Sequence, residues 1–143
     1  MLDTILEAIV GILFGGLLIV LAQQQKLTQR LYALTLISLP MIYVSFGLFS
    51  SRATVIWTEL LYGLPFLVVG LACFLYDFKY TGYIVAATWF LHGCYDMAHD
   101  AFFINPGVPA WYPVMCLAVD FVVGSWILYQ EMAGDSFSNP NPR

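Results

Sequence analysis

The chain has 143 residues, of which 61% are hydrophobic and 10% are charged, and its formal net charge is −4. Soluble domains carry about 25% charged residues, so this composition excludes an ordinary soluble domain. It indicates instead one polytopic membrane domain whose partners include membrane lipids. The sequence has no basic stretch with interleaved aromatic residues, which argues against a nucleic-acid partner.

Five apolar segments each approach the ~20 residues that cross a bilayer. We therefore predict an all-α membrane protein, a bundle of about five transmembrane helices. The segments cover residues 5–22, 31–50, 54–76, 81–103 and 112–130. The first segment predicts a retained helix, because Asp3 and Glu7 stand where a cleaved signal peptide carries positive charge. Residues 1–133 then form a single helical domain, and the polar, proline-rich residues 134–143 form a disordered tail.

Positive charge is distributed unevenly between the two sides of the predicted bundle. Lys26, Arg30 and Lys79 fall in connections on one side, and Arg52 falls on the other. The positive-inside rule places the first three in the cytoplasm, with the N-terminus outside and the C-terminus inside. We expect the membrane to be the bacterial inner (plasma) membrane.

Small residues on the first and last segments offer weaker signals. Gly11 and Gly15 form a GxxxG pattern, which is typical of a close helix seam and predicts a homo-oligomer through these two glycines. Glycine is also common in membrane helices without such a role.

The three cysteines lie in apolar segments without a CxxC spacing, which does not indicate disulfides. Cys116 stands out because it precedes Asp120 by four residues.

Ionisable residues gather in the outer half of three predicted helices. His92, Asp96 and His99 are separated by four and three residues, which places them on one helical face. Glu59 and Asp120 lie at similar depths in the third and fifth segments, about 7 to 12 Å below the outer surface. No Lys or Arg falls inside a predicted span, so these acids must be protonated, hydrogen-bonded to histidine, or bound to a cation.

Three interpretations of this cluster remain open at the level of sequence. In the first, His92, Asp96, His99 and Asp120 bind a divalent metal, zinc or iron, since imidazole and carboxylate suit both. In the second, the same groups form a proton relay or a metal-free acid–base site. In the third, they form a satisfied polar network that joins helices.

The first interpretation favours a membrane enzyme that acts on a lipid or another hydrophobic small molecule. The metal would activate water or polarise the substrate, and Asp120 or Glu59 would be the catalytic base. A proton, ion or metal-ion transporter is an alternative, although no ionisable residue lines the inner half of any predicted helix. A non-catalytic accessory subunit of a membrane complex is the third class.

The order of residues from 82 to 126 resembles a small uncharacterised family of bacterial integral membrane proteins, a domain of unknown function. The residues that carry the resemblance are Trp89, His92, Asp96, His99, Asn105-Pro106, Pro109, Cys116, Asp120 and Trp126. The chain departs from the pattern at Asp100, where a second histidine is expected, and at Phe121, where a proline is expected. The resemblance supports a site and implies no particular reaction.

Overall fold

Five long helices make up the computed structural model, which describes residues 1–24, 28–50, 52–76 and 79–134. They are α1 (Leu2–Gln24), α2 (Thr28–Phe49), α3 (Ala53–Leu75), α4 (Thr81–Phe102) and α5 (Tyr112–Ala133). The described residues contain no strand, so the expected all-α bundle of five helices is confirmed. Gly134 ends α5 in the left-handed conformation with φ 84°, and the rest of the predicted tail lies outside the described residues.

Four of the five helices are long and apolar enough to cross a membrane: α1, α2 from Arg30 onward, α3 and α5. Helix α4 has 22 residues and a similar length, but its histidines and aspartates lower its hydropathy. The helix boundaries differ from the predicted segments by up to three residues. Arg30, expected in a connection, lies in the first turn of α2, and α5 continues to include Glu131, which is buried.

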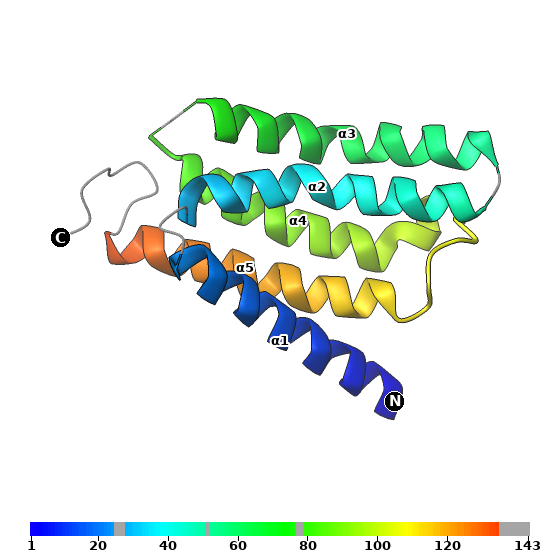
Figure 1. Cartoon of the computed structure of the whole chain (residues 1–143), viewed down its shortest axis with the longest axis horizontal. Helices are drawn as coiled ribbons and strands as arrows, with labels where there is room; N and C mark the ends of the chain where they lie inside the picture. Colours follow the sequence, from blue (N-terminus) through cyan, green and yellow to red (C-terminus); the bar gives the residue numbers. More distant parts are fainter. Residues whose placement is uncertain (25–27, 51, 77–78, 135–143) are drawn as a thin grey trace.

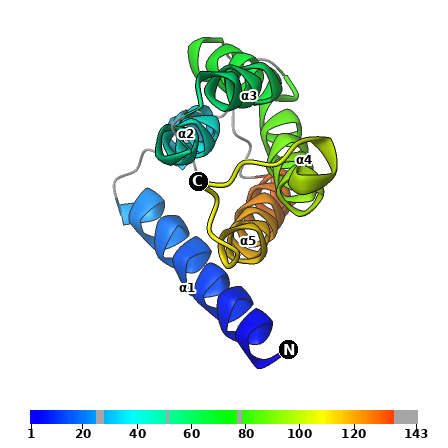
Figure 2. The same cartoon turned by 90° about the vertical axis from the view of Figure 1, so that its right-hand side faces the viewer.

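Helices α2, α3, α4 and α5 run lengthwise beside one another, whereas α1 crosses at an angle (Figures 1 and 2). The closest pairs are α2 with α3, α4 with α5, and α1 with α5. The connections between α2 and α3 and between α4 and α5 lie at the same end of the bundle, on the right in Figure 1. We call this end the Asn105 end, after the residue that leads the second connection.

The core divides along the helix axes into an apolar and a polar half. Most of the fully buried apolar side chains lie in the half away from the Asn105 end; examples are Tyr32, Leu36, Val85, Trp89, Val123 and Ile127. A smaller cluster of Tyr43, Tyr112 and Cys116 lies nearer the Asn105 end. Five buried histidines and carboxylic acids share this second half, where the candidate site forms, whereas buried Glu131 lies in the last turn of α5 at the other end.

The two glycines of the GxxxG pattern face α5 of the same chain. A Cβ atom added at Gly11 would collide with the backbone oxygen of Met115, and one at Gly15 would lie 3.1 Å from Cβ of Val122. Such small residues let two helix backbones approach closely in a membrane. An oligomer contact through Gly11 and Gly15 stays a prediction, and it would require α1 to leave α5.

Candidate metal centre and buried polar network

Helices α4 and α5 present two matched pairs of polar side chains to each other. His92 and Asp96 lie four residues apart on α4, and Cys116 and Asp120 lie four residues apart on α5. This spacing places each pair on one face of its helix. Because the helices are antiparallel, His92 meets Asp120, with 2.8 Å between Nδ1 and Oδ2. Gly93 keeps the helices close, since an added Cβ would lie 3.1 Å from Cβ of Asp120.

These four residues form a compact donor set. Their ligand atoms all lie within 4.8 Å of one another, and all four side chains are buried. Nδ1 of His92 is 2.8 Å from Oδ2 of Asp120 and 3.4 Å from Oδ2 of Asp96. In a tetrahedral zinc site with bonds of about 2.1 Å, neighbouring donors are about 3.4 Å apart. The spacing of the donors therefore suits one small divalent cation.

Two carboxylate oxygens in this centre have no hydrogen-bond partner among the described residues. They are Oδ1 of Asp120 and Oδ2 of Asp96, and the latter has only the ion-pair contact of 3.4 Å with Nδ1 of His92. The other oxygen of Asp96 accepts a hydrogen bond of 2.8 Å from the hydroxyl of Tyr43. Leaving a buried acceptor unpaired is costly, and the cost is larger for a charged group. A cation between the two aspartates would satisfy both oxygens.

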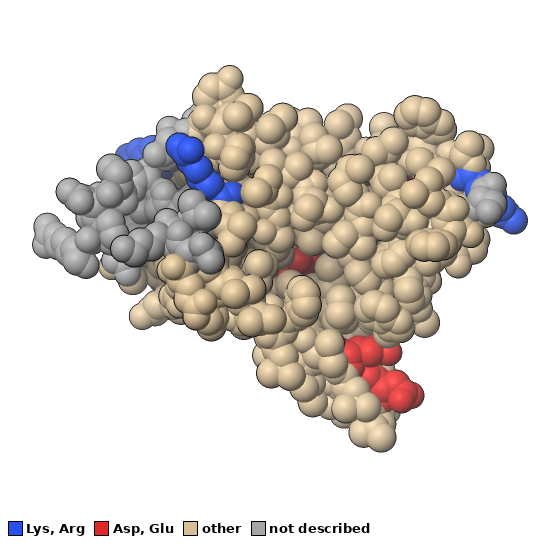
Figure 3. Space-filling view, viewed as in Figure 1, with Lys and Arg blue, Asp and Glu red and all other residues tan. Residues whose placement is uncertain are grey.

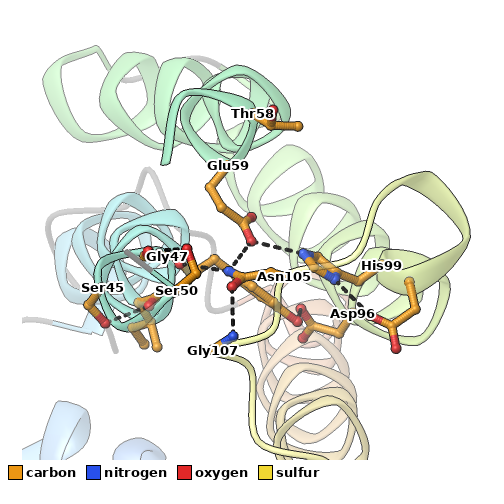
Figure 4. Close-up of polar contacts among 12 residues, drawn as sticks. Ser45, Gly47, Ser50, Thr58, Glu59, Asp96, His99, Asn105 and Gly107 are labelled. Carbon is orange, nitrogen blue, oxygen red and sulfur yellow. Dashed lines mark hydrogen bonds and ion pairs between the residues drawn. The ribbon is translucent and has the colours of Figure 1, made fainter. Parts of the chain in front are cut away.

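A second polar centre lies beside the first, toward the Asn105 end. Nε2 of His99 is 3.1 Å from Oε1 of Glu59, and its Nδ1 is 3.3 Å from Oδ1 of Asp100. Asn105 donates a hydrogen bond of 2.6 Å to the same oxygen of Glu59. Figure 4 shows Glu59 reaching from α3 toward His99 and Asn105. This centre thus joins α3, α4 and the connection that follows α4.

Two tyrosines connect the centres. The Tyr43 ring stacks on His99 at a centroid distance of 4.6 Å, while its hydroxyl binds Asp96. The Tyr95 ring lies 6.3 Å from the ring of His92 and 5.6 Å from that of His99. The two centres are therefore adjacent parts of one buried polar layer.

A family match agrees with the resemblance in the sequence. A model described as a family of unknown function, DUF6010, matches residues 3–133. The chain belongs to this family. No curated protein and no solved structure matches it.

The five residues singled out in this DUF6010 sequence are all buried. They are Glu59, His92, Asp96, His99 and Asp120. The structure divides them between two centres instead of gathering them around one ion. His99 follows His92 by seven positions along α4, a rise of about 10 Å. Two histidine side chains that far apart do not easily both reach one ion at metal–nitrogen bond lengths of about 2 Å. His99, predicted as a ligand, lies outside the four-residue donor set, and Glu59 contacts His99.

Three further residues complete the polar layer. Cys116 precedes Asp120 by four residues, which indicated that the two side chains share a helical face, although the predicted ligand set did not include Cys116. Asn105 precedes a proline and was interpreted as part of a connection, yet its side chain is buried against Glu59. Tyr43 gave no signal, because a single tyrosine in an apolar segment is usually packing or an interface anchor.

Charge in the buried layer of this family member is unbalanced. Its three buried carboxylic acids outnumber its two histidines, and the described Lys and Arg side chains are exposed. His99 can neutralise Glu59, which leaves His92 between two aspartates. That centre is neutral if one aspartate is protonated beside charged His92, or if a divalent cation sits beside neutral His92 and two of the three acidic donors Asp96, Cys116 and Asp120 are ionised. Either state avoids an unpaired buried charge, which is strongly destabilising.

Proposed function

We propose that this protein is a membrane-embedded metalloenzyme that acts on a lipid or another hydrophobic small molecule. A divalent ion, zinc or iron, would be held by the set His92, Asp96, Cys116 and Asp120. The observation that carries the proposal is a buried set of four donors in which two aspartate oxygens lack a hydrogen bond. Imidazole, thiolate and carboxylate are all zinc ligands, and imidazole and carboxylate also suit iron.

Catalysis needs an open position on the ion and a base nearby. Catalytic zinc sites keep three protein ligands and leave a fourth position for water or substrate. His92, Asp96 and Cys116 would supply three, and Asp120 would then serve as the general base. Nδ1 of His92, which lies 2.8 Å from Oδ2 of Asp120, would bind the ion instead of this carboxylate, and Asp120 would then be free to accept a proton. The bound ion would activate water or polarise a carbonyl or phosphoryl oxygen.

A hydrophobic substrate follows from the surroundings of the site. The outer surfaces of α1 and α3 expose large apolar side chains such as Leu13, Phe14 and Leu61, which suit lipid. Helices α2 and α5 make no close backbone contact within the described residues. On the corresponding face, Figure 3 shows a narrow hollow with an acidic group at its bottom. A molecule dissolved in the bilayer would approach the site from this side.

The distribution of charge supports an orientation for the enzyme. Arg30 and Lys79 are exposed near the end away from Asn105, and Arg52 is exposed near the Asn105 end. We therefore place the Asn105 end and the N-terminus outside and the C-terminus in the cytoplasm of a bacterial inner membrane. The metal centre then lies in the outer half of the bilayer.

Elemental analysis of the purified protein tests the metal. The detergent-solubilised wild type, incubated with zinc or ferrous iron and then desalted, should hold about one ion per chain. His92→Ala and Asp96→Asn should each lower the content toward zero, because each removes a donor. His99→Ala is the matched control and should keep the ion. A wild type that stays metal-free after incubation overturns the proposal, and loss of the ion in His99→Ala overturns the four-residue donor set.

A further inference from the structure

His99 stands between two carboxylates that lie in different environments. Its Nδ1 faces Asp100, whose side chain is 80% exposed, and its Nε2 faces Glu59, which is fully buried. Histidine is the side chain best suited to pass a proton near neutral pH, because either ring nitrogen can take or release one. A buried imidazole that bridges a surface acid and an interior acid has the geometry of a proton carrier.

The surroundings hold the ring in this bridging position. Tyr43 from α2 stacks on one side of it, and Tyr95 from α4 meets it edge-on. The titratable groups that face His99 are thus Glu59 from α3, Tyr43 from α2, and Tyr95 and Asp100 from α4. Of these acids and phenols only Asp100 has an exposed side chain. Exchange with water therefore passes through Asp100.

We propose that Asp100, His99 and Glu59 form a one-sided proton path between the membrane surface at the Asn105 end and the buried polar layer. In the inward direction, Asp100 takes a proton from water and transfers it to Nδ1 of His99. The ring releases its Nε2 proton to Oε1 of Glu59. An O–H bond on Asp100 breaks as the N–H bond at Nδ1 forms, and the N–H bond at Nε2 breaks as an O–H bond on Glu59 forms, so one proton moves inward and no electron is transferred. The reverse sequence returns the proton to water and restores the starting tautomer.

Such a path suits a metal centre that exchanges protons with the outside. Histidine and cysteine lose protons when they bind a metal, and acid–base catalysis takes up and releases protons in each cycle. Tyr43, whose hydroxyl binds Asp96, stacks on His99, so the path ends beside the metal centre. This purpose rests on the proposed function, whereas the path itself rests only on the contacts of His99.

Ring-labelled histidine tests the path directly. The chain has two histidines, so protein labelled with ¹⁵N-histidine gives two sets of ring signals in NMR spectra. Both rings are buried to the same extent, at 1% exposure. We expect the His99 ring protons to exchange with solvent much faster than those of His92. Asp100→Asn should slow the exchange of His99 by about 100-fold, since an amide cannot carry the proton.

A matched control and a second measurement make the outcome decisive. Asp3→Asn removes an exposed acid on α1 and should leave both histidines unchanged. An unchanged His99 rate in Asp100→Asn overturns the path. Stopped-flow mixing with zinc and a pH-indicator dye should show slower proton release in Asp100→Asn, with the same total release. A failure to bind both zinc and ferrous iron overturns the proposed function and leaves the exchange result standing. Equal release rates in wild type and Asp100→Asn overturn the assigned purpose.

Discussion

The three cysteines give the sharpest test of the donor set, because they occupy three different environments. Cys116 lies in the metal centre, Cys73 is buried in the apolar core, and Cys94 is exposed. Removing one of four donors should weaken metal binding by more than the 10- to 100-fold loss that is typical when a residue hydrogen-bonded to a ligand is replaced. A 100-fold loss corresponds to about 2.7 kcal/mol of binding free energy. We expect at least this loss in Cys116→Ala.

Cobalt(II) provides the assay, because a cobalt–thiolate bond gives charge-transfer absorption in the near ultraviolet. The wild type and Cys94→Ala should show this band with the same affinity, and Cys116→Ala should lack it. Cys73→Ala creates a cavity of similar size in a buried position, so it separates loss of a ligand from loss of stability. The donor set is refuted if Cys116→Ala keeps the band and the affinity, or if Cys73→Ala loses both.

Three further predictions concern stability. Gly11→Ala should lower the free energy of unfolding by about 1–3 kcal/mol, because the added Cβ would collide with the backbone of α5. Gly16→Ala is the control and should leave the free energy of unfolding unchanged, because an added Cβ there would have nothing within 4 Å. Tyr43→Phe removes the hydrogen bond to a buried carboxylate and should cost about 2 kcal/mol in denaturant titrations, while the exposed Tyr129→Phe should be neutral. Asn105→Ala leaves a buried carboxylate with one donor fewer and should lower the unfolding temperature; an unchanged temperature would contradict that role.

Helix number and the buried positions were predictable because each depends on local pattern. A run of about 20 apolar residues specifies a helix long enough to span a bilayer. An acid inside such a run must face other protein groups rather than lipid. Glu59, His92, Asp96 and Asp120 were therefore located from their positions along the chain alone.

The pairing of those groups was not predictable from the chain, because it depends on how the helices are rotated and aligned. Equal depth suggested a single centre, whereas the alignment of α4 with α5 sets His92 against Asp120 and Cys116 near Asp96. The rotation of α3 brings Glu59 to His99 instead. Tyr43 was missed for the same reason, since its role depends on where its hydroxyl reaches across to α4.

The position of the polar layer separates an enzyme from a transporter, and this difference is measurable. From Asp120 to Glu131 on α5 is about 16 Å of helix, and the buried side chains between them include Val123 and Ile127, which are apolar. Protons that arrive through Asp100 therefore meet no buried carboxylate or histidine on the stretch of α5 between these two acids, all of which the structure describes, and proteoliposomes with a pH gradient should leak no faster than empty vesicles. A protonophore added at the end confirms that the vesicles are sealed. Steady proton flux through the wild type, abolished in Asp100→Asn, would show that the path crosses the bundle and would replace the enzyme with a transporter.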